Sequence, residues 1–200
     1  MSCLLSLHGI DNAGKTTQAR LLQDRLIESL PNRTVEIITF PQVELLESTV
    51  ANLLRDRHES IESDATTLMQ SREYLWLETI KPKLDDGEIL ILPWATDPAV
   101  VKFMIDRWNN LNAQIENLTL IGDLIFCLDV ASPVAAKRGG TAIPAIYELP
   151  QGMMRIYVQL SNNQTGKIER INSNTQTDIV ATQIWRYVEP KITDLLISRR

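Results

Sequence analysis

The sequence predicts a doubly wound α/β domain, in which helices flank a parallel sheet of five strands. Short apolar runs alternate along the chain with longer segments whose apolar residues recur at helical spacing. Two of the runs, 88–92 and 124–130, are apolar almost throughout, which is typical of strands buried on both faces of a parallel sheet. No linker or repeat interrupts the alternation. We therefore expect residues 1–200 to form a single domain that binds its ligands at the carboxyl ends of the strands.

The first forty residues form a predicted β-α-β unit. The apolar run 3–7 is the first strand, and the run 34–40, which Pro41 stops, is the second. A helix between them is indicated by apolar residues three or four positions apart, which end before Pro31: Ala19, Leu22, Leu26 and Leu30.

The middle of the chain supplies helices around the third strand. Asp64 is a predicted N-cap, and the helix that it begins is expected to end near Lys81–Pro82. Asp86-Gly87 then turns the chain into the strand 88–92. The helices predicted in this part of the chain are 45–57, 65–80 and 99–108.

The last third of the chain contains the fourth and fifth strands, 124–130 and 167–171. Gly139-Gly140 opens a segment that we expect to be flexible. A closing amphipathic helix from Thr177 is indicated by its apolar face, Ile184, Trp185, Val188 and Ile192. The other helices predicted here are 133–138 and 151–160.

The composition limits the kinds of partner. A 200-residue chain with 44 % hydrophobic residues can bury one good core. Twenty basic and twenty-five acidic residues give a net charge of -5, which argues against a nucleic-acid polymer as partner and makes any phosphate affinity local. No apolar run is long enough to span a membrane. Cys3 and Cys127 lie in apolar runs, so we expect buried thiols and a cytoplasmic protein without membrane attachment.

The stretch Gly9–Gln18 matches the phosphate-binding pattern G-x-x-x-x-G-K-[ST]. Its glycines let the backbone curl so that N–H groups point at a phosphate, Lys15 adds a positive charge, and the Thr16 hydroxyl can bind magnesium. The strand before it and the helix after it are the context that this mechanism requires. A glycine turn that binds nothing is the alternative. The residues expected to bind the nucleotide are Gly9, Asn12, Ala13, Gly14, Lys15, Thr16 and Thr17.

Several further motifs, together with this loop, resemble the thymidylate kinase family. The likeness spans nearly the whole chain in the right order, although only the phosphate loop with its Asp11 and Gln18 is strongly specific. The other motifs that carry it are Phe40-Pro41, Ser71-Arg72, Ile80-Lys81-Pro82, Asp123-Leu124, Leu128-Asp129-Val130, Ala135-Ala136-Lys137-Arg138, Tyr147-Glu148 and Ile168-Glu169-Arg170-Ile171-Asn172.

The resemblance implies a nucleoside monophosphate kinase that uses ATP with Mg²⁺, and commonly a homodimer. Lys15 and Arg138 would be its catalytic cations, and the segment 137–150 would form a lid over the triphosphate. Asp11 would meet the sugar of the acceptor nucleotide, Arg72 would contact its base, and Phe40 would also belong to the acceptor site.

Each of these roles has a structural alternative. Asp11 is also explained as a loop aspartate that caps backbone N–H groups. Arg72 shares a helix face with apolar residues, so its stem alone could cover them. The basic pair Lys137-Arg138 is also favoured at a helix end by the helix dipole.

The chain departs from the family where charge is expected. Val43 stands where the family has an arginine. The third strand ends in Asp-Arg in the family, whereas here it ends in Leu92-Pro93-Trp94. Asn12 fills a loop position that can carry a catalytic arginine, and residues 139–154 contain no basic residue. Because one arginine can be worth about 10³–10⁵ in the rate of phosphoryl transfer, two hypotheses stay open. The chain is either a divergent kinase or a nucleotide-binding protein of kinase ancestry that acts through a partner.

Overall fold

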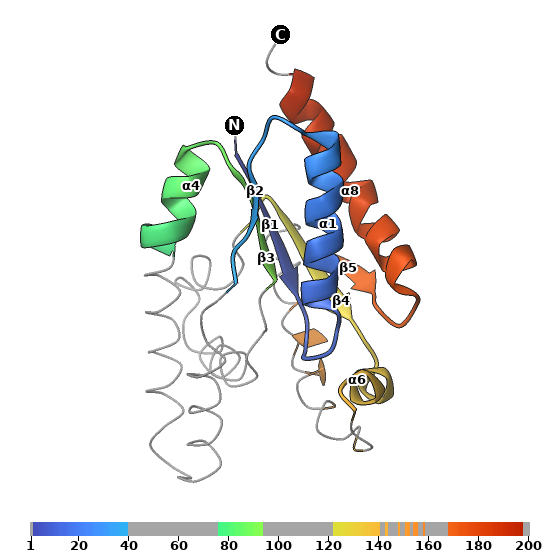
Figure 1. The fold of residues 1–200 in the computed structure, drawn as a ribbon. Helices are drawn as coiled ribbons and strands as arrows, with labels where there is room; N and C mark the ends of the chain where they lie inside the picture. The colour runs from blue at the N-terminus through green and yellow to red at the C-terminus, as the bar shows by residue number, and fades with distance from the viewer. Residues whose placement is uncertain are drawn as a thin grey trace, which may run out of the picture.

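A parallel sheet of five strands forms the centre of the structure, a computed structural model (Figure 1). The strand order is β2-β3-β1-β4-β5, and every neighbouring pair is parallel, as the sequence predicts. The strands are β1 Cys3–His8, β2 Val35–Ile37, β3 Ile89–Pro93, β4 Leu124–Asp129 and β5 Ile168–Asn172. The residues that the structure describes are 2–39, 76–93, 122–140, 143, 148, 151, 152, 154, 155, 158 and 168–197.

The central strand, β1, is buried along its whole length because strands pair with both of its edges and a hydrophobic core covers each of its faces. Leu5 lies beside Ile91 of β3, and Leu7 lies beside Phe126 of β4. Leu5, Leu7 and Phe126 are almost completely shielded from solvent. This burial on both faces explains why the sequence of the central strands is apolar without alternation.

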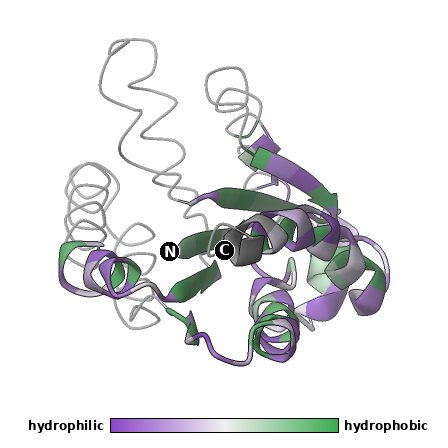
Figure 2. Ribbon diagram, turned by 90° about the horizontal axis from the view of Figure 1, so that it is seen from above, coloured by the Kyte–Doolittle hydropathy of each residue, from purple (hydrophilic) through white to green (hydrophobic). Residues whose placement is uncertain are grey.

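Helices cover both faces of the sheet. Helices α1 (Lys15–Ser29) and α8 (Thr177–Ile197) lie side by side on one face, and α4 (Lys81–Asp85) lies on the other (Figure 1). The strands are hydrophobic along most of their length, whereas the helices carry both hydrophobic and hydrophilic residues (Figure 2). The core on the α4 face contains Leu4, Ile38, Ile80, Leu90 and Leu92, and the larger core contains the buried hydrophobic residues of α1 and α8. The doubly wound class is therefore confirmed.

Two predicted boundaries are wrong. The helix expected to end near Lys81–Pro82 continues, because a π-helical turn, Trp76–Ile80, passes into α4 with Pro82 in its first turn. Pro82 stands where the π-helical turn passes into α4, so it falls at a change of hydrogen-bonding pattern rather than inside a regular α-helix. The second strand is β2, Val35–Ile37, rather than 34–40, although the N–H of Ile38 still donates to the carbonyl of Ile91 at 3.0 Å.

The remaining elements agree closely with those predicted from the sequence, where the structure describes them. Helix α6 spans Ser132–Arg138, and the described residues 151, 152, 154, 155 and 158 are helical. The four apolar residues predicted to face the core from α8 are all buried. The predicted helices 45–57 and 99–108, and residues 65–75 of the third, lie outside the described residues.

Both cysteines are free and buried, as expected, and no disulfide joins them. Burial raises the pKa of each thiol to about 12, so neither Cys3 nor Cys127 forms a reactive thiolate near neutral pH. Among the described residues, no helix combines the length and apolar character needed to cross a membrane.

Helix α1 offers a test of this packing. Leu26 is fully buried, whereas Leu21 on the same helix is 39 % exposed. We expect Leu26→Ala to lower the free energy of unfolding by about 2–5 kcal/mol, because it leaves a cavity against the sheet. Leu21→Ala should change it by less than about 1 kcal/mol. Urea unfolding followed by circular dichroism measures both, and equal losses would show that α1 is not packed as described.

Candidate functional site

The phosphate loop joins the carboxyl end of β1 to the start of α1, and it runs close to β4. A Cβ at Gly9 would lie 2.9 Å from the carbonyl oxygen of Leu128, so no side chain fits there. Gly14, the N-cap of α1, has φ 98°, a conformation that glycine adopts most readily. Asn12 also has a positive φ, 60°, which asparagine tolerates better than most residues. The two glycines and Asn12 therefore fit the curled backbone that the motif requires.

Lys15 is the first residue of α1, and its side chain folds back over the loop. Its Nζ donates to the carbonyl oxygens of Gly9 at 2.9 Å and Ile10 at 2.8 Å. Burial lowers the pKa of Lys15 from 10.5 to about 8, while the nearby negative charge of Asp11 acts in the opposite direction. The loop thus holds a desolvated cation for which an anionic ligand would be a better partner than two carbonyls.

A polar cavity of about 760 Å³ opens over the loop and the N-terminus of α1. This helix end offers backbone N–H groups and a positive dipole, the arrangement that binds phosphate in many proteins. Seven residues expected at the site line the cavity together with Arg138: Asp11, Asn12, Ala13, Gly14, Lys15, Thr16 and Thr17. Gly9 forms the start of the loop behind them, and Phe40 and Arg72 lie outside the described residues.

Arg138, at the end of α6, contacts the phosphate loop. Its Nη1 donates to the carbonyl oxygen of Asn12 at 3.3 Å, and its Nη2 donates to the carbonyl oxygen of Ser173 at 2.7 Å. The guanidinium therefore forms part of the cavity wall. Its place in a lid stays a prediction, because most of the segment 137–150 lies outside the described residues.

The cavity also contains residues that the sequence did not single out as ligand-binding. Gln18, Ser173, Thr175, Thr177 and Val180 belong to its lining. Most of them follow β5, at the same edge of the sheet as the phosphate loop. The polar run after that strand was the available signal, because the carboxyl ends of parallel strands meet at one edge.

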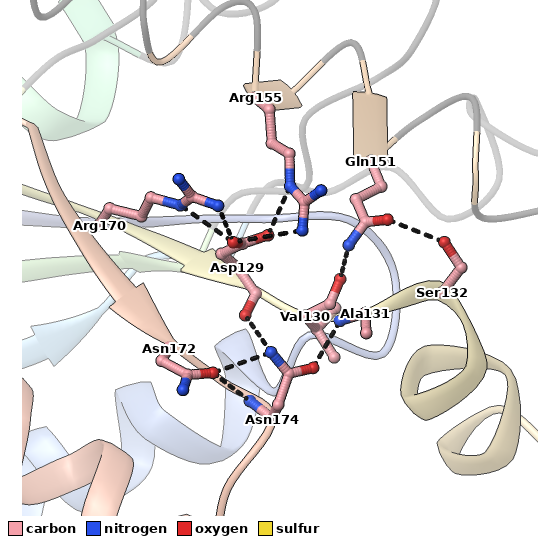
Figure 3. A network of polar contacts seen from close by, with 9 residues as sticks. All are labelled: Asp129, Val130, Ala131, Ser132, Gln151, Arg155, Arg170, Asn172 and Asn174. Atoms are coloured by element: carbon pink, nitrogen blue, oxygen red, sulfur yellow. Dashed lines mark hydrogen bonds and ion pairs between the residues drawn. The ribbon is translucent and has the colours of Figure 1, made fainter.

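A hydrogen-bond network fixes the end of β4 beside this cavity (Figure 3). Arg155 and Arg170 both pair with the carboxylate of Asp129, which is mostly buried. Ser132 of α6 donates to the side chain of Gln151 at 2.9 Å, and Gln151 donates to the carbonyl oxygen of Val130. The network joins β4, β5, α6 and the helical residues 151 and 155.

Thr16, which is expected to bind magnesium, lines the cavity with Asp11 and with further residues that carry side-chain oxygens. Magnesium commonly takes one or two protein oxygens and completes its shell with water and phosphate, so these residues fit the ion. No cluster of three acidic, histidine or cysteine residues suited to a metal occurs in the described part of the chain. The strand β3 ends at Pro93, which lines the cavity without offering charge or an N–H.

A phosphate loop at the carboxyl end of β1, in a parallel sheet of this strand order, defines a phosphate-loop α/β protein. The model of the family "Thymidylate kinase" matches residues 7–184, and the chain belongs to this family. The family resemblance seen in the motifs is thereby confirmed.

Relatives at low sequence identity agree with this assignment. A thymidylate kinase of Desulforudis audaxviator is 26 % identical, with 93 % of this chain and 90 % of the relative covered. A probable thymidylate kinase of Methanosarcina acetivorans is 30 % identical over 68 % of this chain and 69 % of its own length. The crystal structure of thymidylate kinase from Ehrlichia chaffeensis has the same fold. It superposes with a TM-score of 0.58 at 20 % identity over 94 % of this chain and 98 % of that one.

The lowered pKa of Lys15 predicts a pH dependence of stability. Between about pH 8 and pH 10.5 the unfolded chain keeps a proton on Lys15 that the folded chain has released. The free energy of unfolding of the natural protein should therefore rise with pH in this window, relative to Lys15→Met, by up to about 3 kcal/mol. The raised thiol pKa values act in the opposite direction, but they do so in both proteins. Urea unfolding at a series of pH values measures the difference, and parallel curves would contradict it.

Proposed function

We propose that this protein is an ATP-dependent nucleoside monophosphate kinase, which transfers the γ-phosphoryl group to dTMP or a related (deoxy)nucleoside monophosphate. The carrying observation is the polar cavity over the phosphate loop, with the buried cation of Lys15 at its base. Membership of the thymidylate kinase family supports the choice of reaction and of acceptor. A homodimer, implied by the same membership, stays a prediction.

The chain's own groups have distinct tasks in this reaction. Loop N–H groups and the N-terminus of α1 bind the β- and γ-phosphates, and Lys15 exchanges its two carbonyl partners for phosphate oxygens. Thr16 would hold magnesium, which neutralises charge on the phosphates when it is bound with ATP. Asp11 is our candidate for the acceptor sugar. An oxygen of the acceptor phosphate forms the new bond to the γ-phosphorus as the bond to the β–γ bridging oxygen breaks, which releases ADP.

Arg138 is our candidate for a second catalytic cation. Its guanidinium already lies in the cavity wall, within 3.3 Å of a phosphate-loop carbonyl. Phosphoryl transfer depends mostly on positioning and on neutralising charge on the moving group, and a guanidinium suits both tasks. Arg72 and Phe40 complete the proposed acceptor site from outside the described residues.

One observation favours a second candidate, a nucleotide-binding protein with weak transferase activity that acts through a partner. Pro93 ends β3 in the cavity, where the family resemblance leads us to expect an acid. A proline neither binds magnesium nor donates a backbone hydrogen bond. Val43 and Trp94, two further departures, lie outside the described residues. We therefore expect slow transfer rather than none.

Replacing the loop lysine tests nucleotide binding. Lys15→Ala should raise the dissociation constant of ATP about 10- to 100-fold, because it removes a charge-assisted partner of the phosphates. Lys81→Ala is the matched control, since Lys81 is exposed on α4, pairs with Asp85 and does not line the phosphate cavity. Titration calorimetry with Mg-ATP measures both variants, and a chelator should also weaken binding. An unchanged affinity of Lys15→Ala would exclude the triphosphate assignment.

Restoring the missing charges tests transfer. The natural protein should release ADP slowly in the presence of each nucleoside monophosphate, and Pro93→Asp combined with Trp94→Arg should raise kcat at least about tenfold. Pro93→Asn with Trp94→Gln changes the same positions without adding charge and should bring no gain. Rapid turnover of dTMP by the natural protein would contradict this account of Pro93. ATP binding without any acceptor-dependent turnover would favour the second candidate.

A further inference from the structure

The peptide group between Ala13 and Gly14 is held in place by hydrogen bonds to its carbonyl oxygen. The hydroxyl of Ser173 donates to the carbonyl oxygen of Ala13 at 2.5 Å, and the Nη1 of Arg138 approaches the same oxygen at 3.5 Å. A trans peptide directs its C=O and N–H groups in opposite directions. The bond from Ser173 therefore fixes the direction of the Gly14 N–H, in the loop segment that lines the cavity.

Ser173 can act in this way because its own position is fixed. It is only 2 % exposed, and its backbone N–H donates to the carbonyl oxygen of Asp129 at 2.9 Å. The next residue, Asn174, accepts a bond from the N–H of Ala131 at 2.6 Å and donates to Asn172 at 2.8 Å (Figure 3). The turn after β5 is thus fastened to the end of β4.

Arg138 connects the same turn to the loop from a third element. It binds both the carbonyl oxygen of Ser173 and that of Asn12, so α6, the turn and the loop share one guanidinium. The carbonyls of Gly9 and Ile10 are held separately, by Lys15. Four loop carbonyls therefore have partners before any ligand is present.

We propose that Ser173 is a positioning residue, which presets the phosphate loop for the phosphate chain of a nucleoside triphosphate. This proposal rests on the proposed function and deepens it. Without the hydroxyl, the buried carbonyl of Ala13 loses its closest partner and the 13–14 peptide can rotate. Part of the binding free energy of the triphosphate is then spent on ordering the loop. The acceptor site is assigned to Asp11, Arg72 and Phe40 rather than to this peptide, so we expect a smaller effect on the acceptor than on ATP.

Ser132 supplies a matched control for Ser173. It is also a buried serine, at 4 % exposure, and it donates one hydrogen bond, to Gln151 at 2.9 Å, but neither residue lines the phosphate cavity. Ser173→Ala should raise the dissociation constant of Mg-ATP about tenfold, which corresponds to about 1.4 kcal/mol. The KM of the acceptor should stay within about twofold. Ser132→Ala should bind ATP as the natural protein does, whatever melting temperature it has.

A second pair of variants keeps the test independent of folding. Ser173→Thr keeps the hydroxyl, whereas Ser173→Val replaces it with a methyl group. Threonine and valine have nearly the same shape, so both variants add the same bulk at the buried position. The Thr variant should bind ATP more tightly than the Val variant, by about tenfold.

Two results would overturn the proposal. One is equal ATP affinity of Ser173→Ala and the natural protein, with equal affinity of the Thr and Val variants. The other is a parallel rise of the acceptor KM, which would show general loosening of the fold. Failure of the natural protein itself to bind ATP would count instead against the proposed function.

Discussion

The phosphate loop leaves the sheet through a space too narrow for a side chain at Gly9. A Cβ there would come within 2.9 Å of the carbonyl oxygen of Leu128 and 3.0 Å of the Cβ of Ala13. This close approach to β4 brings the loop within reach of the turn after β5 and of α6. The hydrogen bonds from Ser173 and Arg138 depend on it. A bulkier residue at this one position would separate the loop from its supports even if every other motif residue were kept.

The features that the sequence predicted best are those set by neighbouring residues. The curled loop depends on Gly9, Gly14 and Lys15, which lie within one short stretch, and the central strands are marked by their own apolar runs. Pro82 was misjudged because the same residue breaks a helix interior and fits a first turn, and a local pattern does not distinguish the two. The contact between Ser173 and Ala13 spans 160 residues, so it depends on the register of β4 against β5.

The charges of the site are local and partly concealed. The whole chain has a net charge of -5, yet the loop gathers the ammonium of Lys15 and the guanidinium of Arg138 around its carbonyls. Both cations already have hydrogen-bond partners. A single small anion must displace two carbonyls from Lys15 and forms few hydrogen bonds in return. A polyphosphate offers several charged oxygens at once, which can replace those carbonyls. Such an arrangement favours long phosphate chains over single small anions.

The place of β1 in the sheet affects how the chain folds. It is the central strand, yet it precedes both of its partners, and the N–H of Leu4 binds the carboxylate of Asp123, 119 residues further along. Such distant pairings require the chain to lose conformational entropy before the stabilising contacts form, and this slows folding. During synthesis at the ribosome, β1 and the phosphate loop therefore lack their neighbour on one side until β4 has emerged. A pause in translation before that point would leave an apolar edge open to aggregation.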